Sequence, residues 1–336
     1  MRAITERREL SSIAYGFIAS KALFAALGVG PFTHLASGPR TTAELSHDTG
    51  IAASPLQTLL HALSAVGLIV AEGHSYTNAP ACQRYLAQGA PDEFGEYFRL
   101  QLGQQIYPAL LQLDAGLTGT GAASDTFADL LSRPDEARTF TAAQHAGSRG
   151  AAHVLAKRTP LGGARTMLDV GGGSGALSIA LCTRNPRLRA AVLDFPAVID
   201  VARTYIDEAG LGARIDLLSG DAVHTPWPAD QDVVLLSYLL SALGATEIDM
   251  VLAKAYTSLA AGGLLIVHDF MIHDDASGPA SAALWFLQYL AFRGDGISFS
   301  AGALSGRLRH HGFTPAETEV LIPDTTKTIL ARKASP

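Results

Sequence analysis

A glycine-rich loop lies near the middle of the chain, between an apolar run and a helical pattern. Residues 166–170 are expected to form a buried strand, and residues 171–175 read Gly-Gly-Gly-Ser-Gly. Glycines let the backbone approach a ligand closely and take positive φ, and a helix start offers unpaired N–H groups. The pattern therefore predicts a loop that cradles a nucleotide-like ligand.

Three aspartates follow three apolar runs, and together they indicate which ligand. Asp169 stands two residues before the first glycine, where it favours a ligand amino group and would repel a pyrophosphate. Asp194 ends the run 190–194 and suits ribose hydroxyls, and Asp221 follows the run 215–219, on the expected adenine side. Because the carboxyl ends of parallel strands meet at one edge, the acids should converge on one crevice. We therefore predict S-adenosylmethionine.

Two alternatives remain open at this level. The spacing Gly171-x-Gly173-x-x-Ala176 also satisfies the dinucleotide pattern, so an NAD-dependent dehydrogenase is the rival enzyme class. The aspartates could also do no more than cap helices and turns.

Composition narrows the class of protein. The 336 residues, 48% hydrophobic and 17% charged, allow two domains and a large core, and the net charge of −6 argues against nucleic acid as the main ligand. Cys82 and Cys182 lie far apart, so we expect no disulfide framework and no metal site. Glu6, Glu9 and Lys21 interrupt the signal-like N-terminal region, so we expect no secretory signal or spanning helix, and the cysteine usage indicates a reducing cytoplasm.

The first third of the chain predicts a winged-helix-like module over residues 1–105. Helices are expected over 11–27 and 54–66, with a short helix capped at Thr42 between them, and 68–77 is expected to form a hairpin. Such a module raises the possibility of a DNA-binding regulator. However, the helix before the hairpin contains no Lys or Arg, so dimerisation and substrate shaping are the favoured role.

The following residues, to about 150, are predicted to be helical and are rich in amides and aromatics. We expect residues 106–155 to form a helical linker over a pocket between domains, although ordinary core or surface packing is the alternative. The candidate substrate-binding residues are Tyr97, Gln101, Tyr107, Gln144, Trp285, Gln288 and Tyr289.

From residue 156 onward, strands and helices alternate as in a doubly wound α/β domain. The last two strands are separated only by Pro323–Thr326, so they should form a hairpin with one antiparallel member. The expected strands are 166–170, 190–194, 215–219, 232–236, 263–268, 315–321 and 327–332, with helices at 176–184, 196–209, 247–260 and 301–310.

The motifs LDVGGGSG, LDFPAVID, SGDAV and AAGGLLIVHDF together resemble the class I S-adenosylmethionine-dependent small-molecule O-methyltransferases, the group that includes acetylserotonin methyltransferase. The resemblance covers nearly the whole chain. It implies a Rossmann-like methyltransferase domain with an N-terminal helical dimerisation domain, a homodimer, and a small aromatic or polyketide-like acceptor. The implied cofactor-binding residues are Asp169, Gly171, Gly173, Gly175, Asp194, Phe195, Gly220, Asp221, Ala222 and Ser237.

The chain departs from the family pattern where the general base is expected. Counting from Asp232, the position of the family's catalytic His falls on Ser241, and Gln144 replaces a Met that relatives often carry. Some relatives without that His methylate carbon, and a few bind the cofactor without transferring methyl. O-methylation is the primary prediction, with C- or N-methylation or a non-methylating relative as alternatives. The candidate catalytic residues are Asp269, His268, Ser241 and His145.

Overall fold

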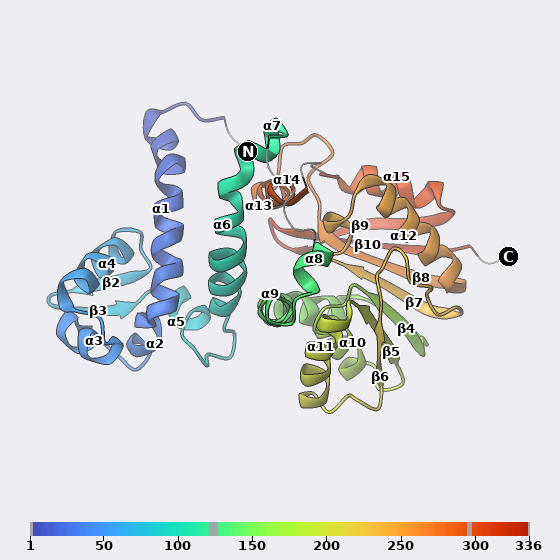
Figure 1. Cartoon of the computed structure of the whole chain (residues 1–336), viewed down its shortest axis with the longest axis horizontal. Helices are drawn as coiled ribbons and strands as arrows, with labels where there is room; N and C mark the ends of the chain where they lie inside the picture. The colour runs from blue at the N-terminus through green and yellow to red at the C-terminus, as the bar shows by residue number, and fades with distance from the viewer. Residues whose placement is uncertain (1–2, 121–126, 294–297, 335–336) are drawn as a thin grey trace. The chain divides into compact units, whose positions relative to one another are not determined.

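The structure is a computed structural model that describes residues 3–120, 127–293 and 298–334 (Figure 1). The chain divides into two compact units, Met1–Pro108 and Ala109–Pro336, and each unit contains hydrophobic clusters of its own. The residues predicted as a separate linker, 106–155, fall almost entirely in the second unit.

The first unit begins with helix α1 (Arg7–Val29), which is longer than the predicted 11–27. The helix ends at Gly30, whose φ of 90° is a left-handed conformation that glycine adopts without strain. The short helix predicted after it is α3 (Thr42–Thr49), and its N-cap is Thr41 rather than Thr42. Thr41 accepts a hydrogen bond from the Glu44 N–H, and the Glu44 carboxylate accepts from the Thr41 N–H, so the capping box starts one residue earlier than predicted.

Helix α4 (Ala53–Ala65) and a hairpin of β2 (Ile69–Glu72) and β3 (Ser75–Asn78) follow, as the winged-helix prediction required. A third strand, β1 (Arg40–Thr41), pairs with β3 and was not predicted, because two residues carry no periodicity. The other elements of this unit are α2 (Pro31–Leu35), α5 (Pro80–Tyr85) and a π-helix, η1 (Tyr97–Ile106), and α6 (Tyr107–Ala109) crosses the boundary between the units.

Helix α1 is also long and apolar enough to cross a membrane by length and composition, with a mean hydropathy of 1.5 over its most apolar part. This differs from the expectation that charges would interrupt it, because Lys21 is the only charged residue between positions 10 and 27. Only 6% of that apolar window is buried within the chain.

The second unit contains a seven-stranded sheet in the order β6-β5-β4-β7-β8-β10-β9. All the predicted strands are present, and β10 runs antiparallel to both of its neighbours, which confirms the terminal hairpin. One boundary was wrong, because β8 begins before the Gly262-Gly263 pair and runs through it, with Gly262 at a φ of 72°. The strands are β4 (Thr166–Val170), β5 (Arg189–Asp194), β6 (Ile215–Ser219), β7 (Gln231–Ser237), β8 (Leu259–Phe270), β9 (Phe313–Ile322) and β10 (Thr326–Lys333).

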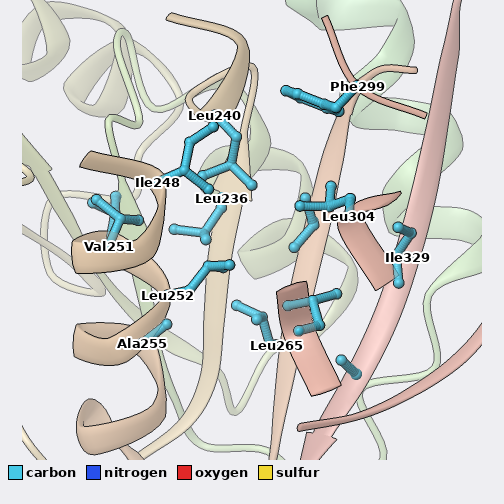
Figure 2. Packing of buried hydrophobic residues seen from close by; sticks show 14 of the residues in the cluster. Leu236, Leu240, Ile248, Val251, Leu252, Ala255, Leu265, Phe299, Leu304 and Ile329 are labelled. Carbon is cyan, nitrogen blue, oxygen red and sulfur yellow. The ribbon is translucent and has the colours of Figure 1, made fainter. Parts of the chain in front are cut away.

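Successive residues of the central strands pack into different cores on the two faces of the sheet. In β7, Val234 and Leu236 join a cluster with α12 and α15, shown in Figure 2, whereas Val233 and Leu235 join a cluster with α9, α10 and α11. Both faces are therefore covered, which explains why β7 reads as a continuous apolar run rather than an alternating one. The helices of this unit are α7 (Leu113–Thr118), α8 (Phe127–Leu131), α9 (Pro134–Arg158), α10 (Ala176–Arg184), α11 (Pro196–Glu208), α12 (Ala245–Ser258), α13 (Ala280–Trp285), α14 (Leu287–Arg293) and α15 (Ala301–His310), with short 3-10 turns η2 (Leu110–Gln112) and η3 (Leu240–Ala242).

Candidate active site

The glycine loop connects the carboxyl end of β4 to the start of α10. The Gly171 N–H donates to the Leu193 carbonyl at 2.8 Å, which ties the loop to β5. Gly171 has a φ of 65°, and a Cβ at Gly172 would lie only 2.8 Å from the Asp169 carboxyl carbon. The loop backbone therefore lies against the carboxylate beneath it, and a side chain at Gly172 would displace that carboxylate.

Asp169 is buried beneath the loop. Its Oδ2 accepts a hydrogen bond from the Ser178 hydroxyl at 2.6 Å, whereas Oδ1 is buried without a partner in the described residues. Burial raises the pKa of Asp169 to about 7. A buried carboxylate oxygen of this kind fits a cationic amino group, which supplies both the missing donor and a compensating charge.

Asp194, the last residue of β5, supports the same loop. Its Oδ2 accepts from the Gly173 N–H at 2.8 Å and its Oδ1 from the Phe195 N–H at 2.8 Å. Desolvation raises its pKa to about 6, against the lowering effect of these two bonds. Each carboxylate oxygen keeps a lone pair, so the group can still accept hydroxyl hydrogen bonds.

Asp221 follows β6 and caps its own turn. Its Oδ1 accepts from the Val223 N–H at 2.6 Å and from the His224 N–H at 2.9 Å. Its side chain thus has the capping role that was the alternative to a ligand contact, although the residue lies in the wall of the cavity described below.

Lys254, which belongs to no recognisable sequence motif, holds the segment after Asp221. From α12 its ammonium group donates to the carbonyls of Ala222 and Val223, both at 2.9 Å, and lies 5.0 Å from the Trp227 ring centroid. Trp227 in turn donates to the Ala222 carbonyl at 3.0 Å. The contacts join positions about 30 residues apart, so no local pattern in the sequence indicated them.

These elements surround one cavity of about 1060 Å³ at the carboxyl edge of β4, β5, β6 and β7. The volume is at the upper end of the range for small-molecule sites and can hold a nucleoside cofactor together with an acceptor. The predicted residues in its wall are Asp169, Gly171, Gly173, Asp194, Phe195, Gly220, Asp221, Ala222, Ser237, Gln144 and Tyr289. Gly175 is not in the wall and instead caps the N-terminus of α10.

The rest of the wall is mostly apolar. Phe140 and Thr141 come from α9, and the Thr141 hydroxyl oxygen is buried without a partner in the described residues. Nothing in the sequence indicates a role for this threonine, because its position is ordinary within a helical pattern. The apolar residues include Leu131, Phe140, Val198, Leu239, Leu243 and Leu290.

Several predicted residues lie elsewhere. His145 is not in the cavity wall, and its Nδ1 lies 2.9 Å from the Ser174 hydroxyl while its ring stacks 3.8 Å from that of Tyr205. Desolvation, assisted by Arg149, lowers the pKa of His145 to about 4. The side chain therefore supports the loop and is a poor base.

Trp285 and Gln288 are also outside the cavity wall. The Trp285 ring stacks on Phe270 with centroids 4.4 Å apart, and the Gln288 amide donates to the Trp285 carbonyl at 3.1 Å. Both residues therefore have the core-packing role that was given as the alternative to substrate binding. Tyr97, Gln101 and Tyr107 belong to the first unit, where Tyr97 packs on Phe94 and Gln101 is buried in η1.

The remaining catalytic candidates are at the end of β8 and after β7. His268 is fully buried between the hydroxyls of Ser237, at 2.9 Å, and Thr326, at 3.0 Å, and burial lowers its pKa to about 3. Asp269 accepts the Ser241 backbone N–H at 3.0 Å, and burial raises its pKa to about 6. Within the described residues, no group of three or more His, Cys, Asp or Glu side chains is placed to hold a metal ion.

The fold and the site define a class: an open α/β domain whose acids and glycine loop form a cofactor crevice at the carboxyl edge of the sheet. Family models place the chain within that class. Residues 117–314 match the O-methyltransferase domain and residues 11–88 match the O-methyltransferase dimerisation domain, so the chain belongs to the O-methyltransferase family. It is an S-adenosylmethionine-dependent methyltransferase, and the family predicted from the sequence is confirmed.

Individual relatives agree with this assignment. The chain is 31% identical to a 3-hydroxy-5-methyl-1-naphthoate 3-O-methyltransferase of Streptomyces sahachiroi, over 84% of this chain and 82% of that protein. It is 28% identical to the N,N-dimethyltransferase OxyT of Streptomyces rimosus, over 94% and 93% of the two chains. The structure of the mitomycin 7-O-methyltransferase MmcR superposes with a TM-score of 0.82 at 25% identity, over 97% of each chain.

Proposed function

We propose that this methyltransferase transfers the methyl group of S-adenosylmethionine to a hydroxyl of a small aromatic or polyketide-like metabolite. The observation that carries the proposal is the cavity, in which the acids and the glycine loop adjoin a predominantly apolar wall. Methyl transfer from a sulfonium is an in-line displacement, so the chain must mainly hold the acceptor at near-attack distance and allow its deprotonation. The bound cofactor supplies the electrophilic methyl group.

The chain's own residues divide between the two ligands. We propose that Asp169 receives the amino group of the cofactor, Asp194 its ribose hydroxyls, and the turn at Asp221 its adenine. Gln144, Thr141 and Tyr289 then offer polar groups to the acceptor in a predominantly apolar wall. A flat molecule with polar edges fits this chemistry.

Carbon or nitrogen methylation is the second candidate. Ser241 stands where an imidazole base is expected, and relatives of this chain include an N,N-dimethyltransferase. An electron-rich ring carbon or an amine needs less help from a strong base than a weakly acidic hydroxyl does.

The oligomer and cell compartment are part of the proposal. The dimerisation-domain match supports a homodimer through the first unit, with α1 buried against a second copy rather than in a membrane. We propose a cytoplasmic enzyme with no nucleic acid partner, in which residues 1–105 dimerise, 106–155 shape the acceptor pocket and 156–336 bind the cofactor. The net charge of −6 is consistent with this.

The experiment that tests the proposed function uses methyl-labelled S-adenosylmethionine and metabolite fractions from the cell that makes the protein. Mass spectrometry and NMR then locate the label. Label on a hydroxyl of an aromatic small molecule is expected. Label on carbon or nitrogen would favour the second candidate, and label on protein or nucleic acid would refute the small-molecule assignment.

A further inference from the structure

A chain of hydrogen bonds leads from the cavity wall into the core of the second unit. Tyr289 on α14 lines the cavity, and its hydroxyl donates to the Ser241 Oγ at 3.3 Å. Ser241, in the turn after β7, is 1% exposed and does not line the cavity. Of the residues in this series of hydrogen bonds, Tyr289 is thus the one that an acceptor can touch.

The hydrogen-bonded chain ends at the carboxylate of Asp269. The Ser241 backbone N–H donates to Asp269 Oδ2 at 3.0 Å, and the Ser241 hydroxyl lies close enough to the carboxylate to lower its pKa. Asp269 Oδ1 accepts the Phe270 N–H at 2.8 Å, and the whole side chain is buried. These bonds hold the carboxylate in place. The hydroxyl groups of Ser241 and Tyr289 connect it to the cavity.

We propose that Tyr289, Ser241 and Asp269 form a proton relay that carries the acceptor's hydroxyl proton out of the cavity during methyl transfer. The acceptor O–H gives its proton to the Tyr289 oxygen, Tyr289 gives its own to Ser241, and Ser241 gives its own to the Asp269 carboxylate. The acceptor oxygen forms a bond to the methyl carbon as the carbon–sulfur bond breaks. The electron pair of the breaking carbon–sulfur bond stays on sulfur. One positive sulfonium and one negative carboxylate become a neutral thioether and a neutral acid, so charge and atoms balance.

A second chain of hydrogen bonds from the cavity is less suitable. It runs from Ser237 to His268 and ends on the Thr326 hydroxyl, within the sheet. Burial lowers the pKa of His268 to about 3, so its neutral imidazole is a weak base and would not retain a proton taken from the acceptor. Asp269, with a pKa raised to about 6, is ionised near pH 7 and is a stronger base than an ordinary carboxylate.

The relay rests on the proposed hydroxyl methylation, and its test compares acceptors of different acidity. The variants Tyr289→Phe, Ser241→Ala and Asp269→Asn are assayed with 2-naphthol and with 4-nitro-1-naphthol, at a pH where only the nitro compound is ionised. Each variant is expected to lower kcat for 2-naphthol by on the order of 10²-fold and to leave kcat for the ionised nitronaphthol nearly unchanged. Tyr256→Phe and Ser305→Ala, which remove hydroxyls outside the cavity wall, are the matched controls.

Equal losses for both naphthols, or no loss for 2-naphthol, would overturn the relay, because a proton path matters only where a proton must leave.

An infrared measurement reads the hydrogen bonds without turnover, in the complex with S-adenosylhomocysteine. At a pH below the Asp269 pKa of about 6, where the group is protonated, the carboxylic C=O band that Asp269→Asn removes should change frequency in Ser241→Ala and Tyr289→Phe, and an unchanged band would refute the hydrogen-bonded chain. If the band shifts but the wild type methylates no naphthol, the hydroxyl-methylation proposal fails, and with it the catalytic role of the relay.

Discussion

The Asp269 carboxylate accepts the backbone N–H of Ser241 at 3.0 Å, although the two residues are 28 positions apart in the sequence. Ser241 occupies the position that the family resemblance assigns to a histidine base, and Asp269 the position of the acid that orients it. The two positions thus remain paired in space, with a hydroxyl in place of the imidazole. A serine hydroxyl is too weak an acid and base to accept the proton unaided, so proton removal at this site depends on what the serine contacts.

Asp194→Ala should weaken S-adenosylhomocysteine binding tenfold or more. The carboxylate supports the glycine loop through the Gly173 N–H and is proposed to accept two ribose hydroxyl bonds, each contributing on the order of 1.5 to 3 kcal/mol before ordering costs. Calorimetric titration measures the change. Asp232→Asn is the matched control, because Asp232 accepts the Arg165 and Thr166 N–H groups at the amino end of β4, away from the cavity. Tight NADH binding without S-adenosylhomocysteine binding would restore the dehydrogenase alternative.

Cofactor affinity should fall as the pH is lowered below about 7. In the cofactor-free protein the pKa of Asp169 is raised to about 7, so the carboxylate is about half protonated at neutral pH. A cationic amino group binds the ionised form, so each pH unit below the pKa should weaken binding by up to tenfold. Calorimetry between pH 5 and 8 checks this, and Asp169→Asn should bind more weakly with a flatter pH profile. An unchanged pH profile in that variant would contradict the assignment.

The Asp169→Asn substitution, which should weaken cofactor binding, should make the protein more stable relative to wild type as the pH rises. Because the folded pKa of Asp169 lies above its unfolded value, the protein binds more protons when folded, and stability is lost as pH rises from about 4 to 7. Asp169→Asn removes this loss, so the Tm of the variant minus that of wild type should increase over this range without cofactor. His145 and His268, whose pKa values are lowered, act in the opposite direction but are common to both proteins. A difference that stays constant with pH would be evidence against a raised pKa.

The sequence predicted the strands, the glycine loop and the acids of the site because these depend on local patterns. Apolar runs, a turn of glycines and an aspartate at a strand end are all readable within a dozen residues. What it missed depends on distant contacts: Lys254 reaches a loop about 30 residues away, and the Thr141 hydroxyl is exceptional only because its helix packs it into the cavity wall. Trp285 was placed in the pocket on residue type alone, and its stacking on Phe270 could not be inferred from periodicity.

Lys254→Met should lower cofactor affinity several-fold although Lys254 is not in the cavity wall. The ammonium group binds three carbonyls of the segment after Asp221, and the substitution leaves these acceptors to water while preserving much of the side chain's volume. The looser segment should raise the KM for S-adenosylmethionine more than it changes kcat. Lys157→Met, at an exposed position of α9, is the control. Equal effects of the two substitutions would exclude a positioning role for Lys254.

Static light scattering should show a dimer at micromolar concentration. Leu10, Ile13 and Phe17 on α1 are 59%, 67% and 59% exposed, and their spacing places them along one side of the helix. Obligate interfaces usually bury more than about 2,000 Å², and this apolar surface would supply part of it. The double substitution Ile13→Glu and Phe17→Glu should yield monomers, whereas Met250→Glu, at an exposed position of α12, should not. A monomeric wild type would refute the proposal.

His268→Ala and Asp269→Asn should each lower kcat by on the order of 10²-fold or less, short of the loss expected for an indispensable base. His268 already has a pKa lowered to about 3, and its two ring nitrogens lie within hydrogen-bonding distance of the Ser237 and Thr326 hydroxyls. Its removal should therefore cost mainly stability, on the order of 1 to 3 kcal/mol for the hydroxyls left without a partner. Thermal unfolding and steady-state kinetics on the same preparations separate these effects, and His268→Gln should recover part of the Tm.

Proximity to an easily ionised acceptor then provides most of the rate, and a His at position 241 is not required for turnover. If either substitution abolishes turnover while S-adenosylhomocysteine still binds, that residue is a dedicated base and proximity is insufficient. If wild type methylates no acceptor, the non-methylating relatives are the better model.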